Sequence, residues 1–152
     1  MLEIINSLFS GLIAAILSGL FFTLLQSIRK LKDLIAILIA LENECNFNSR
    51  HRGDTRSQFQ LYWFEKALML PEFYEYAPEI SLKCLGAFEY AKDANSGNLN
   101  SRTDEKNHRM VASDVQTMMI EISKSIKEII PSLNKQADFW QYLLRSINNL
   151  KN

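Results

Sequence analysis

Twenty-two consecutive residues, Ile4 to Leu25, carry no charged side chain. As a helix rising about 1.5 Å per residue, this run is roughly 33 Å long, enough to cross a hydrocarbon core of about 30 Å. Core helices of soluble domains are rarely apolar over such a length. The run therefore predicts a transmembrane helix, which we assign to residues 1–28.

Three other interpretations of the apolar run stay open. A cleaved secretory signal would begin with basic residues and have a shorter apolar segment, whereas Met-Leu-Glu precedes Ile4 here. The run could also be a buried core helix. Finally, the N-terminal helices of several copies could bury one another in a soluble homo-oligomer. Length and the absence of charge favour the membrane interpretation over these.

The charges that flank the run predict its orientation. Arg29, Lys30 and Lys32 follow it closely, whereas the acidic Glu3 precedes it. Because positive residues are retained on the cytoplasmic side of a membrane, we expect the N-terminus outside and residues 29–152 in the cytoplasm. The sequence thus predicts a single-pass protein of the inner (plasma) membrane, with the lipid bilayer as its first partner.

Small side chains recur at every fourth position of the run, at Ser7, Gly11, Ala15 and Gly19. Residues four apart lie on one face of a helix. Small residues let two helix backbones approach closely, which favours association where lipid removes the hydrophobic drive. These four residues predict an oligomerisation face, and the protein is expected to be a homo-oligomer.

Apolar residues continue after the basic border in a pattern typical of a helix. Leu34 to Leu41 is too short to span a bilayer, and it predicts a helix that runs to about Asn48. One face of that helix would present Ile35, Leu38, Leu41 and Cys45 to a core. The pattern leaves open that residues 29–48 continue the membrane helix without a break.

Proline positions divide the rest of the chain. We predict a short helix within residues 58–70, with a buried strand as the alternative, that is closed by Pro71. A connecting stretch over 72–77 and a new helix beginning at Pro78 follow. A strongly periodic helix follows and is expected to end at Pro131, with a last helix beyond it.

The predicted fold class is therefore all-α. No segment shows the alternation of an exposed strand, so residues 29–152 are expected to form a cytosolic antiparallel bundle of four or five helices. Cys45 and Cys84 lie in helical segments among apolar residues and are expected to be buried thiols, with a disulfide as the alternative.

The composition excludes several classes of function. Lysine plus arginine and aspartate plus glutamate each number 17, which is unlike a generally basic nucleic-acid-binding protein. Phosphate-binding, dinucleotide and zinc-hydrolase signatures do not occur in the sequence. We therefore expect no cofactor and no metal site.

One basic cluster stands out after the predicted helix end. Arg50, His51, Arg52 and Arg56 occur within seven residues, with Asp54 among them. Guanidinium groups bind phosphates and carboxylates in a bidentate manner. These four residues form a candidate site for an anionic small ligand or an acidic protein partner, and a solvated loop is the alternative.

A second polar segment contains Arg102 and His108, separated by five residues. An arginine followed after four to six residues by histidine is the motif of the HEPN ribonuclease superfamily, and the chain resembles these small helical bundles, which cut RNA without metal and pair the motif across a dimer. The resemblance implies that His108 acts as general acid or base and that Arg102 stabilises the phosphate in the transition state. Thr103 fits the small polar position after the arginine only in part.

The sequence therefore predicts a membrane-anchored, oligomeric helical module that binds a partner or ligand and has no catalytic residue. One version is a membrane-perturbing effector of bacterial antiphage defence. The alternative is a membrane-tethered, HEPN-like ribonuclease that uses Arg102 and His108, and RNA is a partner only in that case.

Overall fold

The computed structural model describes residues 2–50, 58–96 and 105–149, and all regular structure in these ranges is helical. This confirms the predicted all-α class. The helices, in chain order, are α1 (Leu2–Asn48), α2 (Tyr62–Leu68), α3 (Pro71–Tyr76), α4 (Pro78–Ser96) and α5 (Glu105–Asn149).

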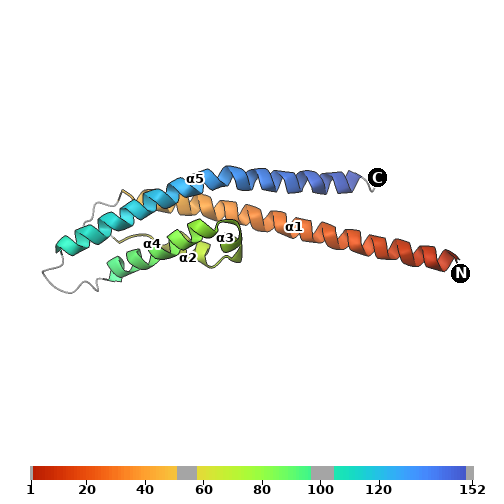
Figure 1. Cartoon of the computed structure of the whole chain (residues 1–152), viewed down its shortest axis with the longest axis horizontal. Helices are drawn as coiled ribbons and strands as arrows, with labels where there is room; N and C mark the ends of the chain where they lie inside the picture. The colour runs from red at the N-terminus through yellow and green to blue at the C-terminus, as the bar shows by residue number, and fades with distance from the viewer. Residues whose placement is uncertain (1, 51–57, 97–104, 150–152) are drawn as a thin grey trace.

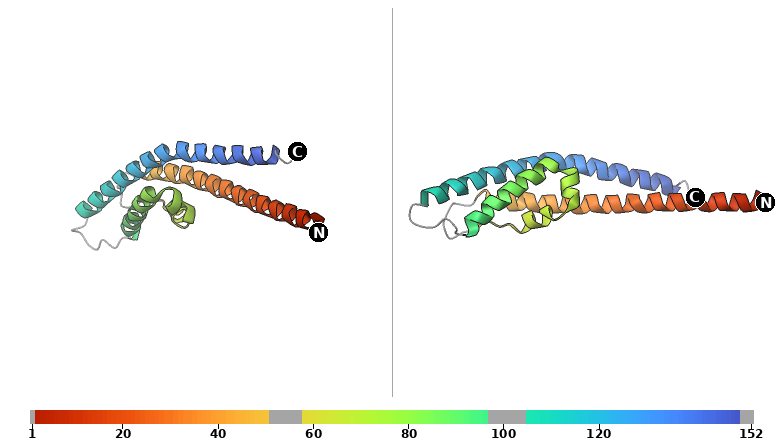
Figure 2. Two further views of the ribbon diagram at one scale, coloured as in Figure 1. Left: turned by 45° about the vertical axis from the view of Figure 1, so that its right-hand side comes forward. Right: turned by 60° about the horizontal axis from the view of Figure 1, so that its bottom comes forward.

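Two long helices form the frame of the molecule. α1 and α5 run antiparallel and lie side by side over much of their length, while α2, α3 and α4 cover one side of this pair (Figure 1). The N-terminal part of α1 extends beyond all the other helices, and the C-terminal part of α5 extends back along α1 and diverges from it (Figures 1 and 2).

The hydrophobic core lies where α1 and α5 meet the shorter helices. The predicted α1 face is confirmed, because Ile35, Leu38, Leu41 and Cys45 are all buried. Opposite them, α5 buries residues at helical spacing, namely Val115, Met119, Ile122 and Ile126. A fully buried leucine or isoleucine stabilises the fold by about 1.5–3 kcal/mol relative to an exposed one, so this seam is the main apolar contribution to stability.

Two asparagine side chains form hydrogen bonds with the non-helical backbone of Phe59 and Gln60, just before α2. Asn48 Nδ2 donates to the carbonyl of Gln60 (2.7 Å), and its Oδ1 accepts from the Gln60 N–H (2.9 Å). Asn95 makes the same pair of bonds with Phe59, at 2.9 and 2.8 Å. An amide that is both donor and acceptor can replace a strand neighbour in this way, which ties the ends of α1 and α4 to the segment before α2.

The stretch predicted as a connection over residues 72–77 is mostly helix, so that prediction was wrong. Pro71 does not only close the preceding helix; it occupies the first turn of α3, where its missing N–H costs nothing. Phe73 is buried there, and Glu72 forms an ion pair with Lys30 at 2.8 Å. This hydrogen-bonded pair raises the pKa of Lys30 and lowers that of Glu72. The predicted start of a helix at Pro78 is correct.

The predicted helix end at Pro131 was also wrong, because α5 continues through this residue to Asn149. Proline removes one backbone hydrogen bond and bends a helix rather than always ending it, and α5 is visibly bent part-way along its length (Figure 1). Ile126 before the proline and Leu133 and Ala137 after it are all buried. Packing on both sides therefore holds the two halves in one helix.

Candidate functional site

The N-terminal part of α1 is not covered by any other described helix, and residues 7–20 are called its bare part below. All residues from 7 to 20 are exposed, including Leu8 at 69% and Phe9 at 64%. The same helix becomes buried from Ile28 onward and crosses the predicted boundary between residues 28 and 29 without a break. Among the described residues, α1 is the one helix long and apolar enough to cross a membrane.

The four small residues Ser7, Gly11, Ala15 and Gly19 belong to this bare part and are all exposed. A Cβ atom added at Gly11 or Gly19 would meet no atom within 4 Å. No part of the described chain therefore requires a glycine at either position.

Hydroxyl groups on the bare part are bonded to their own helix. Ser18 Oγ donates to the Ala14 carbonyl (2.8 Å), and Thr23 Oγ1 donates to the Gly19 carbonyl (2.9 Å). This back-bonding satisfies the donors without water or a second helix. These two hydroxyl groups are thus compatible with an apolar surrounding.

The predicted anion site is described in part. Arg50 directly follows α1, is exposed, and lines a surface depression of about 560 Å³ with Asn43, Asn46 and Phe47. His51, Arg52 and Arg56 lie outside the described residues, so the convergence of the cluster stays a prediction. The depression offers the Arg50 guanidinium and the Asn43 amide to a ligand, which are donors suited to an oxyanion, whereas the Asn46 amide is already bonded to Glu42 and Ser123.

The two residues of the ribonuclease motif are not brought together by any described contact. Arg102 lies outside the described residues. The backbone of His108 belongs to the first turns of α5, but its side chain also lies outside what the structure describes. The catalytic interpretation of this pair therefore stays a prediction.

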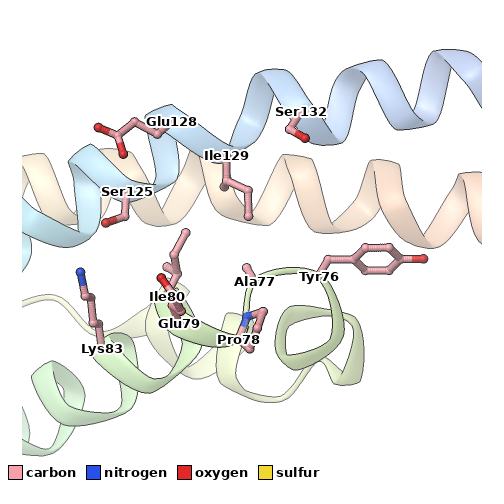
Figure 3. A pocket seen from close by; sticks show the side chains of 10 residues that line it. All are labelled: Tyr76, Ala77, Pro78, Glu79, Ile80, Lys83, Ser125, Glu128, Ile129 and Ser132. Carbon is pink, nitrogen blue, oxygen red and sulfur yellow. The ribbon is translucent and has the colours of Figure 1, made fainter.

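A groove between α5 and the start of α4 was not predicted. It has a volume of about 420 Å³ and is lined on one side by residues 76–80 with Lys83 and on the other by the α5 residues Ser125, Glu128, Ile129 and Ser132. Lys83 and Ser125 extend into the space between the two helices (Figure 3). Charge of both signs beside apolar side chains suits a peptide segment better than a simple anion.

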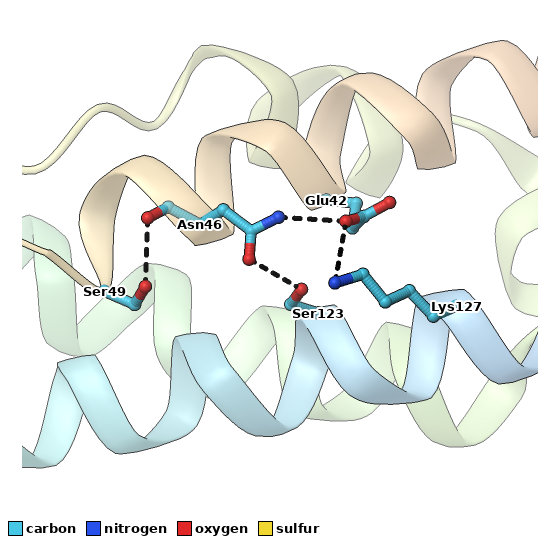
Figure 4. Close-up of polar contacts among 5 residues, drawn as sticks. All are labelled: Glu42, Asn46, Ser49, Ser123 and Lys127. Atoms are coloured by element: carbon cyan, nitrogen blue, oxygen red, sulfur yellow. Dashed lines mark hydrogen bonds and ion pairs between the residues drawn. The ribbon is translucent and has the colours of Figure 1, made fainter.

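A row of polar residues fastens α5 to α1 and was also missed. Ser123 Oγ donates to Asn46 Oδ1 (3.0 Å), and Asn46 Nδ2 donates to Glu42 Oε1 (2.9 Å), which lies 3.4 Å from Lys127 Nζ (Figure 4). Ser49 Oγ in turn donates to the Asn46 carbonyl (3.0 Å). Ser123 could have been recognised from the sequence because its hydroxyl lies beside the predicted buried stripe, between Ile122 and Ile126.

Glu44 is the buried acid of this region. Its Oε2 accepts from the N–H of Trp63 (2.8 Å) at the start of α2, whereas its Oε1 is buried with no hydrogen-bond partner among the described residues. Burial raises the pKa of Glu44, and the backbone hydrogen bonds from Trp63 and Phe64 offset this only in part. Glu44 therefore holds α2 against α1 at the cost of desolvating its carboxyl group.

The cysteines are free and fully buried. Burial raises the pKa of Cys84 to about 12 and that of Cys45 further still, with the nearby Cys84 and acidic side chains adding to the shift at Cys45. Both are thus packing residues and not nucleophiles. Within the described ranges, no group of three or more metal-ligating side chains comes together.

Comparison with known proteins adds no relative. No protein-family model matches the sequence, and no curated protein or solved structure resembles it closely enough to count as a match.

Proposed function

We propose that this protein is a membrane-anchored helical interaction module. The N-terminal part of α1 would cross the bilayer and associate with copies of itself, and α2–α5, packed on the rest of α1, would bind a ligand or protein partner in the cytoplasm. This combines the bare part of α1 with a separate, well-packed helical core.

The observation that carries the proposal is the change of exposure along one helix. Residues 7–20 are all exposed and mostly apolar, whereas Ile28, Leu31 and Leu34 of the same helix are buried. Apolar patches on soluble monomers rarely exceed a few hundred Å². A helix that is apolar all round belongs in lipid or among other helices, and both surroundings are part of this proposal.

The charges at the change of exposure support the orientation. Arg29 and Lys32 are exposed at this point, and Lys30 pairs with Glu72 of α3. Retention of basic residues in the cytoplasm would place the helical core on that side. Since Ile28 is already buried in that core, the core would rest directly against the membrane surface.

Self-association is inferred from the small-residue face. Gly11 and Gly19 have open space beside them and no role in the fold of the single chain. Because the hydroxyls of Ser18 and Thr23 bond to their own helix, close packing of backbones would supply the association energy instead of interhelical hydrogen bonds.

The binding role rests on the two hollows of the core. The depression at Arg50 offers donors for an anion, and the groove between α4 and α5 offers mixed charge beside apolar surface. A ligand in the groove would contact both helices, so it would favour one arrangement of α5 against the rest of the core.

Membrane extraction tests the anchor. We expect the full chain to sediment with membranes, to resist carbonate at high pH and to be released by detergent. A matched variant with Leu12→Lys and Ile16→Lys places two charges mid-span at about 2.5–3.5 kcal/mol each and should lose this behaviour. Recovery of the unaltered chain in the soluble fraction without detergent would overturn the proposal.

Protease protection tests the orientation. In intact spheroplasts, protease added outside should leave the helical core uncut, and lysis should expose it. Digestion of the core before lysis would place it on the opposite side of the membrane.

A further inference from the structure

The hydrogen bonds between α1 and α5 fix which residues of the two helices lie level. Asn46 meets Ser123, and Glu42 meets Lys127, so four residues back along α1 correspond to four residues forward along α5. Three more such steps, about 18 Å along the axis, bring Lys30 level with Phe139. The last turns of α5 thus lie beside the inner end of the apolar run of α1, and Figure 1 places them there.

This part of α5 presents uncovered aromatic side chains. Phe139 is 55% exposed and Tyr142 is 68% exposed, and they share a face because they are three residues apart. Trp140 is half-buried, with its ring centroid 5.6 Å from that of Phe139. Tryptophan and tyrosine concentrate at membrane–water interfaces, where an apolar ring and a polar tip are both satisfied.

Two further features identify the surface that covers these rings. By the same register Phe139 lies level with Lys30 and Tyr142 level with Ser27, so the exposed rings of α5 stand at the inner end of the apolar run of α1. Exposed basic residues stand at the same end of the molecule, on α1 at Arg29 and Lys32 and on α5 at Arg145. Rings at the apolar boundary with cations beside them are the composition of an interfacial helix on an anionic bilayer.

We propose that residues 139–147 of α5 form a second membrane contact, lying at the boundary between headgroups and acyl chains in the leaflet from which α1 emerges. Phe139 and Tyr142 face the acyl chains at this boundary, Trp140 lies at the interface, and the long side chain of Arg145, which starts level with Leu24, extends back to the headgroup phosphates. This inference rests on the proposed membrane anchor of α1. α5 contains Pro131, and its C-terminal part bends and diverges from α1 (Figure 1), which leaves the exposed rings of this segment open to lipid.

Tryptophan fluorescence provides the test, because the chain has two tryptophans at different levels. Trp63 bonds to Glu44, which is fourteen residues, or about 21 Å, along α1 from Lys30. The full chain with Trp63→Phe reports on Trp140 alone, and the chain with Trp140→Phe reports on Trp63 alone. Each is reconstituted in phosphatidylcholine–phosphatidylglycerol vesicles with acyl chains that are either plain or brominated near the headgroup.

We expect brominated lipid to quench Trp140 strongly and to leave Trp63 unchanged. Phe139→Asp with Tyr142→Asp should abolish most of the quenching of Trp140, since it places charge on the lipid-facing side. Tyr62→Asp with Tyr90→Asp, which alters exposed aromatics on α2 and α4, should leave the quenching in place.

Flotation of the same vesicles separates this inference from the membrane anchor. Chain that floats with the vesicles while Trp140 stays unquenched would overturn the second contact and leave the anchor intact. Chain that does not float would overturn the anchor, and with it the premise of this contact. Equal quenching of Trp63 and Trp140 would also contradict the inference, because it would place the whole core against lipid.

Discussion

Asn46 on α1 and Ser123 on α5 are joined by a 3.0 Å hydrogen bond between side chains 77 positions apart in the sequence. Ser123 is almost fully buried, and Asn46 is fixed from its other end by Glu42. A bond between helices in a buried, apolar seam permits only one sliding position of α5 against α1. The pair therefore sets how far the C-terminal end of α5 reaches along the N-terminal part of α1.

Removing the amide of Asn46 should destabilise the fold. Asn46→Leu leaves the buried hydroxyl of Ser123 without its acceptor, and an unpaired buried polar group costs about 1–3 kcal/mol. Denaturant unfolding in mild detergent, followed by circular dichroism, measures this loss. Asn43→Leu, at an exposed position three residues earlier, is the matched control and should change stability by less than about 0.5 kcal/mol. Equal losses for both variants would contradict the assigned role of Asn46.

Glu44 should make the stability of the fold depend on pH. Its pKa in the folded state is raised above the ordinary value of 4.5, so the folded protein holds a proton that the unfolded chain releases. The favourable contribution is then fully present below about pH 4.5 and is lost as pH rises through the folded-state pKa. Glu44→Gln removes this titration, so its stability relative to the unaltered chain should be higher at pH 7 than at pH 4.

Unfolding free energies at a series of pH values measure this difference, with Glu89→Gln on the exposed face of α4 as control. A relative stability of Glu44→Gln that stays constant from pH 4 to pH 7, or rises toward acid, would show that the pKa of Glu44 is not raised in the folded state.

Bulk on the small-residue face should weaken self-association. Gly11→Ile with Gly19→Ile should lower the oligomer number in detergent, because the branched side chains hold the backbones apart. The fold itself should be unaffected, since both positions face open space in the single chain. Light scattering on the detergent-solubilised protein gives the oligomer mass.

The control for this experiment alters the opposite face of the same helix. Ile13→Ala with Leu20→Ala removes exposed bulk there and should leave the oligomer mass unchanged. If both double variants have the same oligomer mass, the small-residue face has no specific role in association.

Both cysteines should be inert to thiol reagents in the folded protein. Cys45 and Cys84 are fully buried, and burial raises the pKa of Cys84 to about 12. Because the thiolate is the reactive species, labelling at pH 8 should require opening of the core and should become rapid for both thiols in denaturant. Rapid labelling of the native protein would mean that the hydrophobic core around the two cysteines opens readily.

Much of the fold could be predicted from the spacing of apolar residues. The buried face of α1 at Ile35, Leu38 and Leu41 follows from a helical period, and so does the buried stripe of α5 at Val115, Ile122 and Ile126. Periodicity works here because both helices bury only one side, and that side must repeat every three or four residues.

The two wrong predictions lie where a local sequence signal is overridden by the burial of apolar side chains. Pro131 predicts a helix end because proline loses a hydrogen bond, but Leu133 and Ala137 continue the buried stripe beyond it, and their burial outweighs that loss. The stretch after Pro71 is too short and aromatic to show a helical period, yet burial of Phe73 holds it as α3.

The polar parts of the candidate sites could not be foreseen. Glu44 lies in an acidic, polar stretch that reads as solvated, and only the arrival of α2 at its side buries it. The groove is lined by residues of both α4 and α5. The spacing of residues within one segment does not predict which two helices will pack against each other. The small-residue face, by contrast, can be recognised from the sequence because all its residues lie within one helix.

The unbroken course of α1 from Leu2 to Asn48 has a mechanical consequence. No break in the helix separates the side chains buried in the core from the small residues at Gly11 and Gly19, so both belong to one continuous helix. In the proposed anchor, a rotation of α1 where it contacts α5 at Asn46 would therefore be carried along this helix toward Gly11 and Gly19, in a direction set by how α5 turns against α1.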